Sequence, residues 1–467
     1  MSKLMMIQLQ VAQYAGTAYL NGAVKSAGHE FVLLLSRDVK KIIRAVDHEK
    51  PDLIGFCCMT AMFRMIVAIA RTIKERFDIP IIMGGPHPTL FPDCIQEPSI
   101  DIICRGEGEF AIVDLMNAIQ NKAPFTNLAG FWVKSGQKIH KNALRPLIDP
   151  LDNAPLIDWS CYKGTPVAGH PPYAFVIRGC PYSCTYCFNE KTRKLYPGGR
   201  YVRHFSVERA IEEVRQALAI FPPSPVLFLS DSFGTDLDWM DRFFDRYSQV
   251  TDLPFLIVIR PELASEKCVQ ILSKYKCFNA SIGVESGSER VRREILNRHY
   301  SNEVLLEVAS RLHRYGIKFR TFNMIGLPTE TEDEVWQTID INIRMHSDFQ
   351  RVAIFTPYPG TEITEIAKTH GYLAPDFNYE DIPLNVFSET ALKNVDGNLI
   401  KNQLYLFQTA ILFPKRRPFL RKLMHFPPNL FFRLWFYLTY AYLQRGIEGR
   451  KWVPYLRYLL SNRDYFT

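Results

Sequence analysis

Short apolar runs alternate with amphipathic segments throughout the first 120 residues of the chain. Apolar runs of this length are typical of buried strands, and the segments between them repeat their apolar residues at the helical period. The predicted strands cover residues 4–12, 31–36, 51–60, 79–85 and 100–108, and the predicted helices cover residues 16–28, 39–50 and 62–77. Strands that are apolar throughout and separated by helices indicate a parallel sheet with both faces covered. We therefore expect a doubly wound α/β domain, which binds ligands at the carboxyl ends of its strands.

A second series of strands and helices follows a connector. Residues 130–136 form a short β-like segment, and residues 145–159 are rich in Pro and Asp, as in a linker. Further predicted strands cover residues 173–179, 226–231, 254–260, 279–287, 318–328 and 351–360. These strands end in loops rich in Gly, Ser, Asp or Pro, which is typical of a barrel or partial barrel with its site at the carboxyl end of the strands.

Three cysteines stand close together directly after the first strand of this second domain. Cys180, Cys184 and Cys187 have the spacing C-x3-C-x2-C in the segment RGCPYSCTYC. A structural zinc site needs four ligands. Iron–sulfur clusters are commonly held by four thiolates, so three thiolates leave one iron with an open position. Such an iron can bind a substrate or a cofactor.

This motif resembles that of the radical S-adenosylmethionine enzymes, which also have an aromatic residue, here Tyr186, before the last cysteine. The resemblance implies a four-iron, four-sulfur cluster whose open iron binds S-adenosylmethionine, and reductive cleavage to a 5′-deoxyadenosyl radical. The segments FLSDSFG and GVESGSERV are similar to later loops of that family, which implies that Asp231, Glu285 and Ser286 lie near the cofactor. The segments MIGLPTETEDEV and TPYPGTEI also resemble strand-end loops of the family.

The N-terminal segments PDLIGFCCMT, IIMGGPHPTLFPD and DIICRGEGE resemble the cobalamin-binding domain that precedes the barrel in one large class of these enzymes. The cofactor-binding residues that this resemblance implies lie in two loops: Gly84, Gly85, Pro86, His87, Thr89, Gly106 and Glu107. The chain lacks the D-x-H-x-x-G motif whose histidine binds cobalt in domains of the methionine synthase type. We therefore expect cobalamin without a protein histidine on its cobalt, and His87 is not assigned as a cobalt ligand.

The expected architecture is an α/β chain of four segments. Residues 1–140 form a Rossmann-like cobalamin-binding domain, residues 141–170 a linker, residues 171–365 a partial (β/α)6 radical S-adenosylmethionine barrel, and residues 366–467 a mostly helical, basic and aromatic region.

Each assignment has a plainer alternative. The three cysteines could form a zinc knuckle with a histidine such as His204. The glycine-rich loops could be tight structural turns. Glu285 could cap a helix that begins near Ser288. The other cysteines have no ligand spacing and are expected to be ordinary thiols: Cys57, Cys58, Cys94, Cys104, Cys161, Cys268 and Cys277.

Composition and charge add two points. Hydrophobic residues make up 47% of the chain and charged residues 22%, which excludes a disordered protein. The net charge of +8 is concentrated after Ile411, where the sequence contains eleven Lys and Arg residues and only two acidic residues. The apolar and aromatic residues between these charges predict either a helical cap whose apolar face packs on the protein or a surface that contacts an anionic membrane. The start of the chain lacks the features of a signal peptide, so we expect a cytoplasmic protein whose cysteines are thiols or ligands. If the basic region contacts a membrane, the protein is expected to be peripheral to it.

The predicted function is methylation of an unactivated carbon in a small-molecule or lipid-like substrate. An alternative is radical cyclisation, oxidation or rearrangement without methyl transfer, and a third is a noncatalytic iron–sulfur or corrinoid carrier. An external electron donor such as flavodoxin or ferredoxin is expected as a partner, and nucleic acid is not. Catalytic residues beyond the cofactor sites are not assigned by the sequence.

Overall fold

The computed structural model describes residues 1–231, 233–383 and 389–448. Two compact units are formed: one contains residues 1–179 and 192–224, and the other contains residues 180–191 and the described residues from 225 onward. The four-segment division expected from the sequence stays a prediction.

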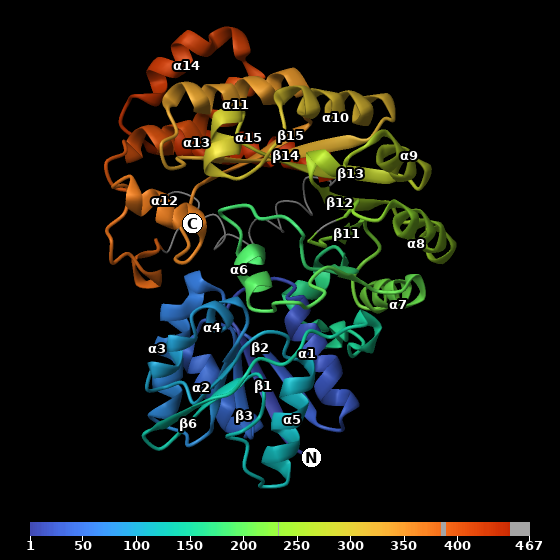
Figure 1. Ribbon diagram of the computed structural model, residues 1–467, viewed down its shortest axis with the longest axis vertical. Helices are drawn as coiled ribbons and strands as arrows, with labels where there is room; N and C mark the ends of the chain where they lie inside the picture. The colour runs from blue at the N-terminus through green and yellow to red at the C-terminus, as the bar shows by residue number, and fades with distance from the viewer. Residues whose placement is uncertain (232, 384–388, 449–467) are drawn as a thin grey trace. The chain divides into compact units, whose positions relative to one another are not determined.

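The first unit is built on one sheet whose strands lie in the order β2-β1-β3-β4-β5-β6-β7. Its strands are β1 (Lys3–Gln8), β2 (Glu30–Leu35), β3 (Leu53–Cys57), β4 (Ile81–Gly84), β5 (Ile102–Cys104), β6 (Phe131–Ser135) and β7 (Lys138–Lys141). Strands β1 to β5 are parallel, whereas β6 and β7 extend the sheet as an antiparallel hairpin. The helices are α1 (Ala15–Ser26), α2 (Val39–Glu49), α3 (Phe63–Lys74), α4 (Pro86–Leu90) and α5 (Glu109–Gln120), with α7 (Val207–Leu218) following later in the chain. Helices α1 and α5 pack together on one face of the sheet, and α2 and α3 on the other (Figure 1).

This arrangement confirms the predicted doubly wound sheet and corrects two details. The expected strand at residues 173–179 is broken into β8 (Tyr173–Ala174) and β9 (Ile177–Arg178). Strand β9 pairs antiparallel with β10 (Arg203–His204). The predicted strand therefore does not continue as one element, because its second half belongs to this separate two-stranded ladder. Strand β7 was not predicted; it returns along β6 after a turn at Gly136, whose φ of 58° suits glycine.

The second unit contains a parallel series of strands in the order β15-β14-β13-β12-β11. These strands are β11 (Val226–Phe228), β12 (Phe255–Ile259), β13 (Cys277–Glu285), β14 (Lys318–Ile325) and β15 (Phe349–Ile354). Each is followed by a helix, in order α8 (Leu237–Val250), α9 (Glu266–Lys274), α10 (Asn302–Arg314), α11 (Glu332–Met345) and α12 (Glu362–Thr369). Helix α6 (Phe188–Lys194) directly follows the three cysteines in the sequence. The alternation of parallel strands and helices confirms the predicted α/β class of this part of the chain.

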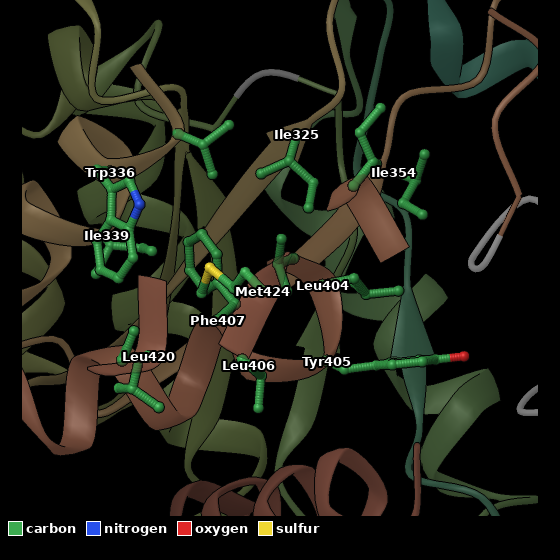
Figure 2. Close-up of a cluster of buried hydrophobic side chains, with 14 of the residues drawn as sticks. Ile325, Trp336, Ile339, Ile354, Leu404, Tyr405, Leu406, Phe407, Leu420 and Met424 are labelled. Carbon is green, nitrogen blue, oxygen red and sulfur yellow. The ribbon is translucent and has the colours of Figure 1, made fainter. Parts of the chain in front are cut away.

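Three C-terminal helices complete the core of the second unit. They are α13 (Gly397–Leu412), α14 (Arg417–Met424) and α15 (Leu430–Glu448). Figure 2 shows their apolar side chains meeting those of β14, β15 and α11: Ile325, Trp336, Ile339, Ile354, Leu404, Phe407, Leu420 and Met424 all belong to one buried cluster. The cluster also includes Phe432 of α15. The predicted helical cap is therefore present as a packed part of this unit. The charged residues Arg450, Lys451, Arg457, Arg463 and Asp464 lie outside the described residues.

Candidate functional site

The three cysteines of the C-x3-C-x2-C motif lie near one another in the second unit. Cys180 and Cys184 are buried, Cys187 is partly buried, and none of them is in a disulfide. Burial raises the pKa of Cys187 to about 11, and the neighbouring Cys184, Cys180 and Asp231 act in the same direction. Among the described residues, no group of three or more His, Cys, Asp or Glu side chains is arranged to hold a single metal ion.

A guanidinium group faces this cysteine cluster. Arg260 directly follows β12, and its Nη1 lies 3.0 Å from Sγ of Cys184. The same group lies 3.7 Å from the ring centre of Tyr182, and its Nη2 is 2.6 Å from Oε1 of Glu262. A fixed positive charge beside a thiol favours the thiolate, which is the form that binds a metal. The sequence analysis missed Arg260.

A second group of buried polar residues lies at the end of β13. Arg298 is only 2% exposed, and its Nη1 donates to Oε1 of Glu285 at 2.6 Å and to the hydroxyl of Tyr186 at 3.2 Å. Its Nε and Nη2 have no hydrogen-bond partner among the described residues. Burial raises the pKa of Glu285, while Arg298 and the hydrogen bond from Tyr186 counteract this effect. The structure therefore joins two predicted residues, Tyr186 and Glu285, to an arginine that sequence reasoning did not find.

The backbone of β13 places the Glu285 side chain. The pairing of β13 with β14 shifts register between Gly283 and Glu285, and Glu285 has a φ of 64°. Irregularities of this kind are common beside functional sites, where they redirect a side chain. Gly283 is also required, because a Cβ there would lie 2.6 Å from Oε1 of Glu285 and 3.0 Å from Nη1 of Arg298. The carboxylate of Glu285 thus binds Arg298 instead of capping the next helical segment.

Glu262 connects the two groups. Its carboxylate lies 2.6 Å from Arg260 and 3.9 Å from Arg298, so one acid is shared by both guanidinium groups. The cysteines, Arg260, Glu262, Arg298 and Glu285 consequently form one continuous polar region at the carboxyl ends of β12 and β13.

The other two predicted residues of this unit differ in their surroundings. Asp231 is exposed and accepts from Nδ2 of Asn189 at 3.4 Å. Ser286 is fully buried; its hydroxyl accepts from the backbone N–H of Ser288 and lies 3.4 Å from that of Thr338. The neighbouring loop residue Ser232 lies outside the described residues.

The two predicted loops of the first unit meet at a threonine. Thr89 donates its hydroxyl hydrogen to the carbonyl oxygen of Gly85 at 2.8 Å and accepts from the backbone N–H of Gly106 at 3.0 Å. Gly85 and Gly106 have φ values of 100° and 80°, which favour glycine. The hydroxyl of Tyr196 would lie 2.1 Å from a Cβ at Gly106. The loops after β4 and β5 are therefore tied together through the Thr89 hydroxyl.

Glu107 and His87 occupy internal positions in these loops. The Glu107 carboxylate accepts from Arg178, from Arg203 and from the backbone N–H of Ile148 at 2.7 to 3.0 Å. Burial opposes ionisation of Glu107, but the two arginines hold its pKa below the ordinary value. His87 is fully buried between Phe63 and Phe91, and burial lowers its pKa to about 4. Glu107 thus anchors the loop after β5, and His87 is an uncharged, buried side chain in the loop after β4.

Comparison with known families decides the identity of both units. The family model of the Radical SAM superfamily matches residues 175–341, which include all three cysteines. The chain belongs to the radical SAM superfamily. The B12 binding domain model matches residues 10–116, which include both glycine-rich loops. This radical SAM enzyme therefore carries a four-iron, four-sulfur cluster, S-adenosylmethionine and cobalamin as its cofactors.

Individual proteins resemble this radical SAM enzyme over most of its length. An uncharacterized methyltransferase of Pyrococcus horikoshii is 29% identical over 377 residues, which cover 77% of this chain and 79% of the relative. An anaerobic magnesium-protoporphyrin IX monomethyl ester cyclase of Rubrivivax gelatinosus is 23% identical over 75% of this chain, and the match spans 65% of the cyclase's length.

Two solved structures share the fold. The radical S-adenosylmethionine methyltransferase TsrM from Kitasatospora setae, with cobalamin and a 4Fe-4S cluster bound, has a TM-score of 0.67 at 16% identity, with 80% of each chain covered. The cobalamin-dependent radical enzyme OxsB has a TM-score of 0.72 at 15% identity, covering 100% of this chain and 73% of OxsB.

The residues present fit these cofactors. Three neighbouring thiols beside the Arg260 guanidinium provide an incomplete thiolate set, as a cluster with one open iron requires. Nε and Nη2 of the buried Arg298 have no hydrogen-bond partner among the described residues, and such donors suit an anionic ligand group. The glycine loops joined by Thr89 have positive φ at Gly85 and Gly106, a backbone shape that glycine adopts readily, and they lie within the residues that the B12 binding domain model matches.

Proposed function

We propose that this protein is a cobalamin-dependent radical SAM methyltransferase that methylates an unactivated carbon of a small-molecule or lipid-like substrate. The observation that carries the proposal is the presence of a B12 binding domain and a Radical SAM domain in one chain. A relative named as a methyltransferase, matched over 77% of this chain, supports methyl transfer as the outcome. When bound, S-adenosylmethionine and the cluster supply a 5′-deoxyadenosyl radical, and cobalamin supplies the methyl group.

The residues of the second unit have distinct proposed roles. Cys180, Cys184 and Cys187 hold the cluster, and Arg260 places a positive charge 3.0 Å from the sulfur of Cys184. Arg298 binds the carboxylate end of S-adenosylmethionine through Nε and Nη2, which form no hydrogen bond within the described part of the chain, while Glu285 fixes the orientation of its guanidinium.

Three further residues of this unit act at the edges of the site. Tyr186 supports Arg298 from the cysteine segment. Asp231, which accepts a hydrogen bond from Asn189 at 3.4 Å, contributes an exposed acceptor in the loop after β11. Ser286 keeps the turn after β13 closed through its bond with Ser288 and so acts on the cofactor indirectly.

In the first unit the proposed cobalamin contacts come from backbone. Gly84, Gly85, Pro86 and Gly106 let the cofactor approach the loops, and Thr89 holds the two loops at a fixed separation. Glu107 positions its loop through Arg178 and Arg203. The neutral side chain of His87, in the short helix α4, is buried and packs between Phe63 and Phe91. An external one-electron donor such as flavodoxin or ferredoxin supplies the reducing equivalent.

The test uses anaerobically purified protein reconstituted with iron, sulfide and hydroxocobalamin. The enzyme is incubated with an extract of small molecules and lipids, a reduced flavodoxin, and S-adenosylmethionine carrying a deuterated methyl group. Methyl transfer predicts a product with the deuterated methyl group, together with both S-adenosylhomocysteine and 5′-deoxyadenosine. Full turnover in the absence of cobalamin would exclude the methyltransferase proposal.

A second candidate is radical cyclisation or oxidation without methyl transfer. The anaerobic cyclase relatives support it, because one of them matches 75% of this chain. This candidate predicts 5′-deoxyadenosine without S-adenosylhomocysteine and an unlabelled product. The same incubation therefore distinguishes the two reactions.

A further inference from the structure

The exposed apolar side chains of the described chain are concentrated in one region. Of the thirteen large hydrophobic residues that are exposed, ten lie between Leu412 and Tyr442. They are Leu412, Phe413, Phe419, Phe426, Leu430, Phe431, Leu434, Trp435, Leu438 and Tyr442. Exposed apolar residues scattered singly need no explanation, but a concentration of this kind marks an interaction surface.

Helix α15 separates its apolar residues into two faces. Leu430, Leu434, Leu438 and Tyr442 recur every four residues and therefore share one face, where they are 52% to 65% exposed. Other residues of the helix pack inward: Phe432 belongs to the core cluster, Phe436 contacts Tyr405, and Tyr440 contacts Phe349. The outward face is thus not a misplaced part of the core, which is already supplied from the same helix.

The basic residues of this region also form two groups. Arg417 pairs with Asp340 and lies over the ring of Trp336, and Arg421 pairs with Glu332 and Asp333. These two arginines hold helix α14 on α11. They are consequently part of the fold.

The second group is exposed and carries unneutralised charge. Lys415, Arg416, Lys422 and Arg433 are exposed, and they make no ion pair with any described residue. The sequence contains no acidic residue between Asp396 and Glu448. Between Leu412 and Tyr442 the exposed apolar residues are interspersed with cations and with no acidic residue, which complements a surface that is apolar with anionic groups at its edge.

We propose that the surface formed by α14, α15 and the segment before them docks on the headgroup region of an anionic lipid bilayer. The apolar residues of α15 enter the interface while Lys415, Arg416, Lys422 and Arg433 meet lipid phosphates, which is the arrangement of interfacial helices. No described helix is long and apolar enough to cross a bilayer, so α15 lies along the surface. The proposal goes beyond the chemistry of the active site, and its failure would leave the methyltransferase proposal untouched.

The test is co-sedimentation of the full-length holoprotein with vesicles of phosphatidylcholine alone or mixed with phosphatidylglycerol. We expect the bound fraction to rise with phosphatidylglycerol content and to fall as salt increases. Charge reversal of the exposed cations Arg416, Lys422 and Arg433 to Glu should weaken binding to mixed vesicles more than tenfold, since each basic residue near an anionic surface contributes about 1 kcal/mol. The control reverses Lys40, Lys41 and Arg44 of α2, which changes the net charge equally on another surface and should leave binding unchanged.

A second pair of variants tests the apolar part. Leu434→Ser with Leu438→Ser should abolish binding, whereas Phe110→Ser, an exposed apolar residue of α5, should not. Iron content and circular dichroism identify any variant that has lost its fold. Failure of the wild type to bind mixed vesicles at low salt would overturn the proposal. So would a wild-type dimer that the Leu434 and Leu438 changes convert to monomer, since the occupant of the surface would then be a second copy of the chain.

Discussion

The guanidinium of Arg298 lies 2.6 Å from the carboxylate of Glu285, and the arginine is 2% exposed. Two opposite charges removed from water depend on one another, because each is costly to bury alone. The irregular strand end, with a φ of 64° at Glu285, directs this carboxylate toward Arg298.

Replacement of Arg298 by Met should therefore destabilise the second unit. The change leaves Glu285 without its main partner, and removal of one member of a buried pair costs about 3–5 kcal/mol in the free energy of unfolding. Urea unfolding of the apoprotein measures this loss. The control is Arg314→Met, because Arg314 forms an exposed pair with Glu266 and should contribute less than about 1 kcal/mol. Equal effects of the two substitutions would contradict the buried-pair interpretation.

Replacement of Cys180, Cys184 or Cys187 by Ala should remove the iron–sulfur cluster. Thiolates are the ligands, so each variant should lose the broad absorbance near about 400 nm and the production of 5′-deoxyadenosine. The control is Cys268 or Cys277, which are buried thiols in α9 and in β13, respectively. Iron analysis after anaerobic reconstitution checks the result, and retention of about three or more irons per chain in all three variants would refute the ligand assignment.

Much of the fold and of this cysteine site could be predicted because the signals are local. A buried strand needs an apolar run, and a cluster with an open iron needs three thiols at close spacing, and both patterns are present within short stretches of sequence. The apolar and aromatic residues between the basic residues of the C-terminal region likewise predicted a helical cap.

Other features depend on contacts between distant residues and have no local signal. Arg260 lies 76 positions from Cys184, and Arg298 lies 112 positions from Tyr186, so only the folded chain brings them together. The split of the strand at residues 173–179 has the same origin, because β9 pairs with β10 more than twenty residues later in the chain. The hairpin strand β7 did have a local signal, the Gly136 turn between two segments of alternating polarity, which the sequence analysis did not use.

The glycines of the first loop allow a test of direct cobalamin contact. A Cβ at Gly84 would meet only the Cβ of Cys104 at 3.6 Å, an ordinary contact, and Gly84 does not have positive φ. Gly84→Ala should therefore keep the thermal stability of the protein while reducing the amount of corrinoid that co-elutes with it. Gly106→Ala, which collides with Tyr196, should reduce both quantities. Full corrinoid retention in the stable Gly84→Ala protein would mean that the cofactor does not approach this backbone.

Glu330 should make the stability of the second unit depend on pH. Burial of its carboxyl group raises its pKa to about 8, whereas hydrogen bonds from Arg290, Thr331 and Ser288 hold the nearby Glu334 at about 2. Because the folded-state pKa of Glu330 lies above the unfolded value of about 4.3, the folded protein binds the extra proton between these values. Its stabilising contribution is complete below about pH 4 and is lost as the pH rises through about 8.

Glu330→Gln should remove this dependence. The amide stays neutral and keeps an oxygen to accept from the backbone N–H of Leu327. The variant should match the wild type near pH 4 and be more stable by about 5 kcal/mol at pH 9, because each unit of the pKa difference corresponds to about 1.36 kcal/mol. Urea unfolding at each pH measures the difference. Parallel stability curves for the two proteins would show that Glu330 is ionised throughout this range.

Removal of the side chain should strongly lower the stability of the protein at one phenylalanine of the C-terminal helices and leave it almost unchanged at another. Phe407 of α13 is fully buried in the cluster of Figure 2, between β14, β15 and α11. Phe407→Ala loses the transfer free energy of the ring and leaves a cavity, so it should lower the free energy of unfolding by about 3–5 kcal/mol. Phe419 of α14 is 60% exposed, so Phe419→Ala should change it by less than about 0.5 kcal/mol. Thermal unfolding of both variants measures the contrast, and a small effect at Phe407 would mean that the C-terminal helices are not part of the core that supports β14 and β15.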